Sequence, residues 1–239
     1  MQQQRDYYAK NAAAYESMHV RPGDEHFIAL EYACAMLGVV RASRVLDVGS
    51  GTGRVVRFLR QRCPAIEVDG VEPVSELREQ ALAHGTGLHA GSGEKLPFED
   101  NSYDVVTAFG VMHHVAAPDI IVAEMARVAR RGVMISDANR FGQGHMMLGL
   151  MKLLIHKACL WGVFEQIRTR GRGYLVSDGD GIYYSYSIFD SVQQVKGWAD
   201  RVLIVPIVPR GNSSLQQLSM SHGLLVALRE PSGPGWAGL

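Results

Sequence analysis

The sequence has no excess of charge of either sign. Its 239 residues contain 24 lysines and arginines and 24 aspartates and glutamates, so the formal net charge is zero at pH 7. Proteins that bind nucleic acid through electrostatics usually carry a clear positive excess. The balance argues against nucleic acid as a partner and favours a small neutral or apolar substrate.

Cysteine is scarce as well. Cys34, Cys63 and Cys159 are an odd number, and no two of them have Cys-x-x-Cys spacing. This pattern argues against a disulfide framework and against a zinc cluster, so we expect no metal. The first residues lack the apolar core of a secretory signal. We therefore expect a cytoplasmic protein.

An uninterrupted apolar run long enough to cross a bilayer is also missing. The segment 145–164 is rich in methionine and leucine, but Lys152, His156 and Lys157 interrupt it. Basic residues at the centre make membrane spanning costly. Three interpretations remain: a helix in peripheral contact with a membrane, a cap over a substrate pocket whose methionines adapt to an irregular ligand, or a buried helix.

The sequence does contain a glycine-rich turn between a predicted strand and a predicted helix. Residues 45–53 read Val-Leu-Asp-Val-Gly-Ser-Gly-Thr-Gly, and the helical pattern of 54–62 follows. Glycine reaches positive φ at little cost and allows the backbone to approach a ligand closely. The turn predicts a ligand-binding loop, with a plain connection as the alternative.

The residues around the glycines discriminate between ligands. Arg54 stands where a phosphate loop needs Lys-Ser/Thr, and also where a dinucleotide fingerprint needs its third glycine. The carboxylate of Asp47 at the mouth of the turn opposes a pyrophosphate and suits a cationic amino group. It favours S-adenosylmethionine, and an NAD-dependent oxidoreductase is the alternative.

A second acidic residue follows the next predicted strand. Residues 66–71 have strand character and end at Glu72-Pro73. One helix and a returning parallel strand fit between Asp47 and Glu72. Ligands of doubly wound sheets collect beyond the carboxyl ends of the strands, where Glu72 can accept from both hydroxyls of a ribose. Alternatively, Glu72 caps the predicted helix 75–83.

Further motifs follow in order: Gly91-Ser92-Gly93-Glu94-Lys95-Leu96-Pro97-Phe98, Ser102–Val106, His113-His114-Val115 and the predicted strand Val133–Asp137. With these motifs the chain resembles the class I S-adenosylmethionine-dependent methyltransferases, in particular the small-molecule branch called the type 11 methyltransferase domain. Two positions depart from the family pattern. Ser92 replaces an aspartate that can accept from adenine, and Arg130-Arg131-Gly132 suggests a tighter turn before the fifth strand.

The resemblance implies an α/β fold, a Rossmann-like doubly wound and mostly parallel seven-stranded sheet with an antiparallel last strand. It also implies a helical N-terminal cover and a helical insertion after strand five. We expect a single domain over 1–230, in line with the chain length. Its expected parts are a helical cover (1–40, with helices 6–15 and 25–37), a cofactor-binding core (44–137), a substrate cap with a lid at 168–173 and 177–181 (138–188), a closing helix and hairpin (189–230) and a flexible tail (231–239).

The end of the chain contributes three local predictions. Ser187 is expected to cap a helix that begins near Phe189. Two strands, 201–209 and 222–229, look like the antiparallel hairpin that closes the sheet of the family. The polar stretch 211–214 lies between them.

Carried over to this sequence, the family's cofactor site assigns the methionine end of S-adenosylmethionine to the glycine turn, the ribose to an acidic residue and the adenine to the following loop. The product would be S-adenosylhomocysteine. Phe109 would lie near the sulfonium, where an aromatic face attracts a cation, and tyrosines of the N-terminal segment would cover the site. The implied cofactor-binding residues are Asp47, Gly49, Ser50, Gly51, Glu72, Pro73, Gly93, Glu94, Phe109, Tyr8 and Tyr15.

A hydroxyl acceptor needs a base in addition to the donor. The candidates are His114, His113, Asp137 and His145, because their motifs place them at or just beyond the carboxyl ends of strands. Each also has a structural alternative, such as a histidine that only bonds the backbone or an Asp137 that caps the turn at Asn139.

We expect methyl transfer to a small molecule, at an oxygen of an apolar or sugar-like metabolite, with carbon and nitrogen as open alternatives. A fold that keeps the cofactor pocket without methyl transfer is a further alternative. The chain is expected to be a monomer or a homodimer.

Overall fold

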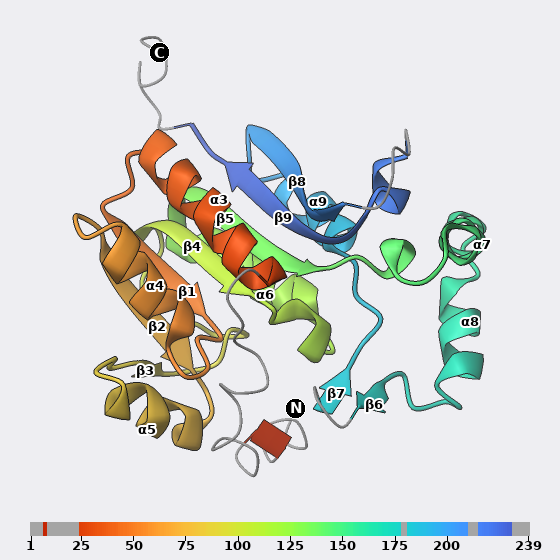
Figure 1. Ribbon diagram of the computed structural model, residues 1–239, viewed down its shortest axis with the longest axis horizontal. Helices are drawn as coiled ribbons and strands as arrows, with labels where there is room; N and C mark the ends of the chain where they lie inside the picture. The colour runs from red at the N-terminus through yellow and green to blue at the C-terminus, as the bar shows by residue number, and fades with distance from the viewer. Residues whose placement is uncertain (1–6, 9–23, 178–180, 210–214, 231–239) are drawn as a thin grey trace.

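A computed structural model describes residues 7–8, 24–177, 181–209 and 215–230, and it contains one large sheet with helices on both faces (Figure 1). The order in this seven-stranded sheet is β3-β2-β1-β4-β5-β9-β8, and β9 runs antiparallel to both of its neighbours. The predicted fold class is confirmed. The strands are β1 (Arg44–Val48), β2 (Glu67–Glu72), β3 (His89–Ala90), β4 (Tyr103–Phe109), β5 (Ala129–Ala138), β8 (Arg201–Pro209) and β9 (Met220–Leu228).

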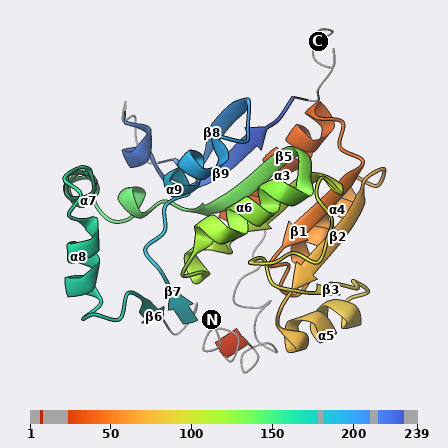
Figure 2. The ribbon, with the colours of Figure 1, turned by 180° about the vertical axis from the view of Figure 1, so that it is seen from behind.

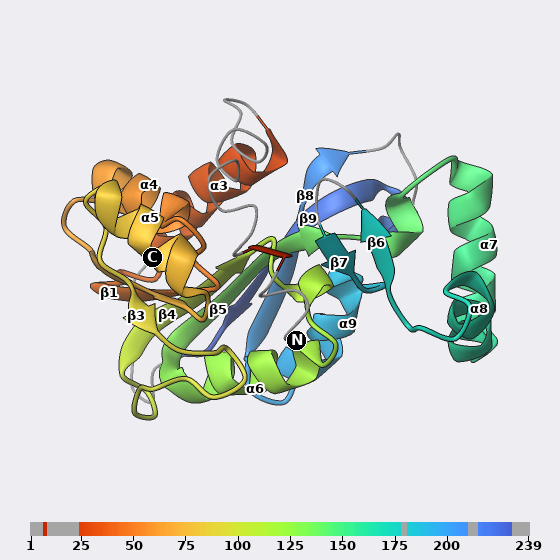
Figure 3. The same cartoon turned by 90° about the horizontal axis from the view of Figure 1, so that it is seen from below.

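Helices cover the sheet in two layers. Figure 3 shows one layer of helices above the sheet and another below it, and Figure 2 shows the second layer from behind. The upper layer contains α3 (Glu25–Val39), α4 (Arg54–Arg62) and α5 (Ser75–Ala83), and the lower layer contains α6 (Pro118–Val128) and α9 (Ile188–Val195).

The central strands are mostly buried because both of their faces are covered. Every residue of β4 is buried. Val105 and Phe109 belong to the core under α3 and α4, whereas Val106 and Ala108 belong to the core under α6 and α9. Alternate side chains of one strand therefore connect both layers.

Local sequence signals explain where the helices begin. Pro118 stands in the first turn of α6, where its missing N–H costs nothing. Ser187 and Asp190 form a capping box at the start of α9, which confirms the predicted cap. The predicted helix 25–37 is present as α3 and extends to Val39, with Asp24 accepting from the Phe27 amide.

The fifth strand differs from the prediction at its start. Arg130-Arg131-Gly132 was expected to form a turn, but β5 already begins at Ala129. Both arginines lie near the buried carboxylate of Asp104 at the start of β4, at 2.9 and 3.5 Å. These ion pairs hold the two arginines against the neighbouring strand, so this expectation was wrong.

The insertion after β5 forms an arm at the margin of the molecule (Figures 1 and 3). A short turn η3 (Arg140–Gly142) leads to α7 (Met146–Lys157) and α8 (Trp161–Arg168). The stretch 145–164 is therefore two helices, separated where Cys159 adopts a φ of 58°. We call residues 146–168 the α7–α8 arm. Among the described residues, no helix combines the length and apolar character needed to cross a bilayer.

A small hairpin follows the arm. The strands β6 (Leu175–Ser177) and β7 (Gly181–Tyr183) pair antiparallel. The segment around 177–181 was expected to be loop-like, so the prediction missed these two strands. Most of the predicted helix 6–15, including Tyr15, lies outside the described residues, as do the polar stretch 211–214 and the predicted tail 231–239.

The close contact between η3 and β9 predicts that a side chain at Gly142 would destabilise the fold. A Cβ at Gly142 would lie 1.7 Å from the carbonyl oxygen of Met220, whereas a Cβ at Gly162 in α8 would meet nothing within 4 Å. Gly142→Ala is expected to lower the free energy of unfolding by more than about 2 kcal/mol. The control Gly162→Ala should leave it unchanged or raise it by up to about 1 kcal/mol. Urea denaturation measures both, and equal effects would contradict the close contact.

Candidate functional site

Two cavities meet at the carboxyl edge of the parallel strands. The smaller one, about 120 Å³, lies between the glycine turn, the end of β2 and the loop at 92–93. The larger one, about 680 Å³, lies between the ends of β4 and β5, the start of α3 and the α7–α8 arm. Their walls share Tyr8, Phe109, Gly110 and His114. A ligand in one cavity can therefore contact a ligand in the other.

The glycine turn connects β1 to α4 and forms one wall of the smaller cavity. Gly49 has a φ of 72° and Gly53 a φ of 80°. A Cβ at Gly49 would lie 2.7 Å from Cγ2 of Val111, the residue that follows β4 closely. The amides of Gly49 and Ser50 donate to the Val71 carbonyl of β2. Glycine is required at Gly49 both for its conformation and for this close approach.

Glu72, at the end of β2, holds the glycine turn in place. Its side chain is buried and lines the smaller cavity. The oxygen Oε2 accepts from the Gly51 amide and Oε1 from the Val74 amide, both at 2.9 Å. A carboxylate oxygen has two lone pairs and can accept a second hydrogen bond, so this geometry allows Glu72 to bind a diol. The predicted capping contact is present in part, because Val74 precedes α5.

Asp47 is buried beneath the turn and is absent from the wall of either cavity. Its Oδ1 accepts from the Thr107 hydroxyl at 2.9 Å, and its Oδ2 has no hydrogen-bond partner. Burial raises the pKa of Asp47 to about 7, although the Thr107 hydroxyl and the charge of Arg54 oppose the shift. A buried carboxylate with an unsatisfied oxygen is stabilised by a cation.

The far end of the smaller cavity is apolar. Pro73 and Gly93, which were both predicted to bind the cofactor, line this end of the cavity together with Ser92. A Cβ at Gly93 would lie 2.9 Å from Cγ1 of Val48, so glycine keeps this end open. Sequence reasoning missed the aliphatic side chains of this end, which the spacing after Glu72 and after His114 could have indicated. They are Val74, Leu77, Val115 and Ile121.

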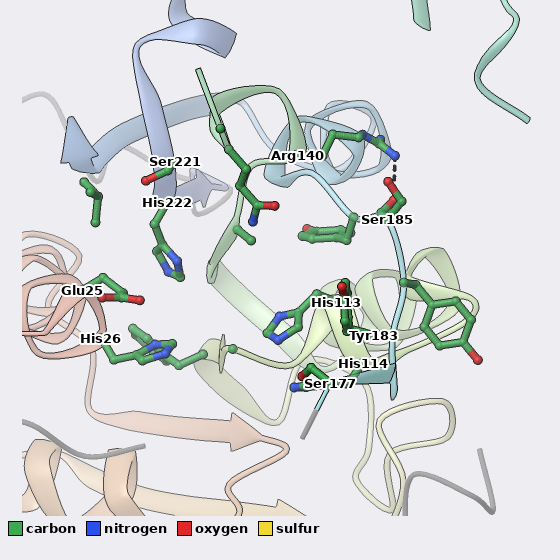
Figure 4. A pocket seen from close by; sticks show the side chains of 18 of the residues that line it. Glu25, His26, His113, His114, Arg140, Ser177, Tyr183, Ser185, Ser221 and His222 are labelled. Carbon is green, nitrogen blue, oxygen red and sulfur yellow. Dashed lines mark hydrogen bonds between the residues drawn. The ribbon is translucent and has the colours of Figure 1, made fainter. Parts of the chain in front are cut away.

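His113 forms a hydrogen bond with Asp137, and the His113 side chain lies beside the larger cavity (Figure 4). His113 Nδ1 lies 2.7 Å from Oδ1 of Asp137, whose side chain is fully buried. Oδ2 of Asp137 accepts from the Met112 amide. Burial favours the neutral acid, but the charge and hydrogen bond of His113 outweigh it and lower the pKa of Asp137 to about 2. An ionised Asp137 accepts the Nδ1 proton of His113, which leaves Nε2 as the basic nitrogen.

His114 has a different environment from its neighbour. Its Nδ1 lies 2.8 Å from the carbonyl oxygen of Ile182, and its ring packs edge-on against Tyr8. The contact with a backbone carbonyl is the structural alternative considered for a histidine after strand four. His114 nevertheless lines both cavities, so it lies at their junction.

Two further histidines line the larger cavity and were missed by sequence reasoning. His26 of α3 and His222 of β9 pack edge to face at 5.3 Å, and His222 Nε2 lies 3.0 Å from the Ser136 hydroxyl. Burial lowers the pKa of each to about 4, so both are neutral at pH 7. His26 Nδ1 is buried with no hydrogen-bond partner. No group of described residues, these histidines included, has the arrangement of a metal site.

The outer wall of the larger cavity is aromatic. Tyr183, Tyr184 and Tyr186 line it from β7 and the following segment, and Trp161 and Phe164 line it from α8. The aromatic run at 183–186 thus reaches the cavity.

Arg140 is one of four cationic side chains that line this cavity, with Arg54, Lys152 and Arg168, and it is paired. Its guanidinium contacts the carboxylate of Asp190 and donates to the Ser185 carbonyl (Figure 4). Its charge is therefore neutralised within the protein. The cavity suits an apolar ligand with a few polar groups.

The structure brings most of the predicted residues to the two cavities. His145 is exposed at the start of α7 and lines neither cavity. Ser50, Glu94, Asp47 and Asp137 are also absent from the walls, and Asp137 does not cap the Asn139 turn. The predicted residues that line a cavity are Tyr8, Gly49, Gly51, Glu72, Pro73, Gly93, Phe109, His113 and His114.

Comparison with known families gives one match. Residues 46–136 match the model of the methyltransferase domain. This range runs from within β1 to within β5. It includes the glycine turn, Glu72 and His113, and it ends one residue before Asp137.

Curated relatives match over the same core. A phosphatidylethanolamine N-methyltransferase of Cereibacter sphaeroides is 30% identical over 119 residues, which cover 43% of this chain and 53% of that protein. A ubiquinone/menaquinone biosynthesis C-methyltransferase of Cupriavidus necator is 33% identical over 140 residues, covering 54% of this chain and 57% of that protein. The matches span about half of these relatives or less. The match to a demethylmenaquinone methyltransferase of Thermotoga maritima covers 41% of that protein.

Solved structures share the fold at low sequence identity. A SAM-dependent methyltransferase of Thermotoga maritima has a TM-score of 0.58 at 15% identity, over 96% of this chain and all (100%) of that one. Another, of Aquifex aeolicus, has a TM-score of 0.56 at 15% identity, over 91% and 97% of the two chains. The whole described sheet therefore has this fold.

The buried Asp47 predicts a pH-dependent stability. Because its pKa is raised to about 7, the folded protein holds the proton more tightly than the unfolded chain, for which about 4 is normal. The stabilisation is complete below about pH 4 and is lost as the pH rises to about 7.

We therefore expect the melting temperature of Asp47→Asn, relative to the parent, to increase as the pH rises from about 4 to about 7. Scanning calorimetry at several pH values measures this difference. Taking the difference between the two proteins removes the contributions of His26 and His222, which have the opposite pH dependence and are present in both proteins. The exposed Asp119→Asn is the control for loss of one carboxylate. A difference for Asp47→Asn that stays constant over this range would contradict the raised pKa.

Proposed function

We propose that this chain is a class I S-adenosylmethionine-dependent methyltransferase and that it transfers the methyl group of S-adenosylmethionine to an acceptor bound in the larger cavity. The observation that carries this proposal is the junction of the two cavities at Phe109, Gly110 and His114. A donor in the smaller cavity and an acceptor in the larger one would meet there.

The residues of the smaller cavity fit the donor. Asp47 lies outside the cavity wall, buried beneath the glycine turn, and the ammonium of a methionine moiety bound at that turn would stabilise its unsatisfied Oδ2. Gly49 has no room for a side chain, and without one its backbone can be approached closely by a ligand. Glu72 would accept from the ribose hydroxyls, and the apolar end at Val74 and Ile121 would hold the adenine. When bound, the donor supplies a methyl group activated by a positively charged sulfur.

His113 is our candidate for the general base. Asp137 holds its Nδ1 proton, and the ring faces the larger cavity (Figure 4). Nε2 can then accept a proton from an acceptor hydroxyl, and the carboxylate of Asp137 stabilises the resulting imidazolium. Such a base contributes about 10²- to 10⁴-fold to a rate. This arrangement favours an oxygen acceptor, and it favours His113 over His114 because His114 contacts a backbone carbonyl instead.

An apolar acceptor fits the larger cavity better than a sugar. Its outer wall is aromatic, and two of the cationic side chains in the wall are paired, Arg140 with Asp190 and Arg168 with Glu165. Curated relatives named for phosphatidylethanolamine and for demethylmenaquinone act on lipid-soluble molecules. No observation supports the alternative of an NAD-dependent oxidoreductase.

Donor binding tests the first half of the proposal. Titration calorimetry should detect binding of S-adenosylmethionine and none of NAD. Asp47→Asn and Glu72→Gln are each expected to weaken donor binding by about tenfold or more, because each removes a charge-assisted contact. For the parent, the Kd should rise as the pH falls below about 7, the pKa of Asp47, by up to about tenfold per unit.

The matched control is Glu94→Gln, which removes a half-buried carboxylate that lines neither cavity and that, unlike Asp47, is not buried with an unsatisfied oxygen. It should leave the Kd unchanged. Tight NAD binding, or equal losses in Glu94→Gln and Glu72→Gln, would defeat the assignment of the smaller cavity.

Methyl transfer tests the second half. With labelled donor and an extract of lipids and small metabolites, His113→Gln is expected to lower the transfer rate by about 10²-fold or more while the donor Kd is unchanged. Asp137→Asn should lower the rate as well, because the amide can present its N–H to Nδ1 and favour the wrong tautomer. The control His145→Gln changes an exposed histidine and should retain the rate.

Donor binding without labelled product in any extract would favour a fold that binds the cofactor without methyl transfer. Equal rates for the parent and His113→Gln would remove His113 as the base. A pH–rate profile whose acidic limb disappears in His113→Gln would distinguish proton transfer from a purely structural role.

A further inference from the structure

The α7–α8 arm exposes an apolar face on each of its two helices. On α7, Met147, Leu150, Met151 and Leu154 follow one another at i, i+3, i+4 and i+7, which places them on one side, and Met147 is 82% exposed. On α8, the exposed apolar residues Leu160, Val163 and Ile167 follow with similar spacing. We call these seven residues the outer face.

The outer face is not needed to attach the arm to the protein. On the opposite side of α7, Leu153 packs with Phe141 and Leu218 in a small buried cluster. Beside it, a Cβ at Gly149 would lie 2.3 Å from the carbonyl oxygen of Phe141, so the helix touches the backbone of η3 there. The fold thus uses one side of α7 and leaves an equally apolar side exposed. Exposed apolar patches of this kind mark interaction surfaces.

The charge around the outer face is strongly one-sided. Residues 139–177 contain six arginines and lysines and a single acidic residue, Glu165, in a chain whose net charge is zero. The arm and its flanks are therefore basic, and the rest of the chain is acidic. Glu165 is itself paired with Arg168. The basic residues are Arg140, which is buried and paired with Asp190, the half-buried Lys152, and the exposed Lys157, Arg168, Arg170 and Arg172.

We propose that the outer face docks on the surface of a membrane that contains anionic lipids. Apolar side chains flanked by basic ones are what such a surface binds, through the acyl boundary and the negative headgroups together. A second copy of this chain is a poorer occupant, because joining two outer faces would bring two basic segments together. With 12 and 8 residues, α7 and α8 are too short to span a bilayer and would lie in its plane.

Docking would place the larger cavity at the membrane interface. Lys152 of α7 and Trp161, Phe164 and Arg168 of α8 line this cavity. An acceptor could then pass from the lipid phase along the arm into the cavity. Its class would be a membrane amphiphile with an apolar body and a hydroxyl-bearing head. This consequence rests on the proposed function, whereas the docking itself does not.

Vesicle binding by the full chain tests the docking. In co-sedimentation, the chain should bind vesicles of phosphatidylcholine mixed with phosphatidylglycerol, bind vesicles of pure phosphatidylcholine more weakly, and lose affinity as salt is added. Met147→Asp and Ile167→Asp should each lower the partition coefficient by about tenfold or more. Lys157→Gln should lower it by about fivefold.

The control is Leu82→Asp on α5, an exposed apolar residue far from the arm in sequence and fold (Figure 1). It should bind vesicles as the parent does. No binding to either vesicle, or an equal loss in Leu82→Asp and Met147→Asp, would overturn the proposal. It would also be overturned if Met147→Asp only converted a dimer to a monomer in sedimentation equilibrium. Donor binding, measured on the same samples by calorimetry, shows separately whether the proposed function fails.

Discussion

The hydrogen bonds between the Glu72 carboxylate and the backbone around it organise the smaller cavity of this protein. One carboxylate accepts from Gly51 in the turn after β1 and from Val74 before α5. It joins two neighbouring βα connections at the carboxyl edge of the sheet, next to the point where the strand order reverses between β1 and β4. The turn keeps its shape because Gly49 lies against Val111 after β4. Three strand ends are thereby held around one cavity.

Two buried acids of the site have opposite pKa shifts. Asp47 is buried with an unsatisfied oxygen, so its pKa is raised, whereas the buried Asp137 is paired with His113 and has a lowered pKa. Burial acts to raise the pKa of both acids, and their charged and hydrogen-bonding partners determine whether the net shift is upward or downward. One acid can take a cation from a ligand, and the other fixes the proton of a histidine. A cationic donor and a hydroxyl acceptor would need just these two environments.

The core of the protein could be predicted from its sequence, and the substrate side only in part. The glycines, Glu72 and the alternation of strands and helices are local signals, so the sheet and most of its ends were expected. The pairing of Asp137 with His113 rather than His114 depends on which of two adjacent rings points toward β5, and spacing does not determine that. His26 and His222 come from elements almost two hundred positions apart and meet only because α3 packs over β9. Arg130 and Arg131 were misread because their partner, Asp104, lies on another strand.

The sequence by itself determined the alternating α/β order, the left-handed glycine turn and the acid at the tip of the second strand, since each depends on neighbouring residues and backbone conformation. Only the tertiary structure decided which side chains line the two cavities and which side of α7 stays exposed. It also decided which buried carboxylates have partners. These features depend on burial and on contacts between distant segments, and the strength of an electrostatic interaction is set by both.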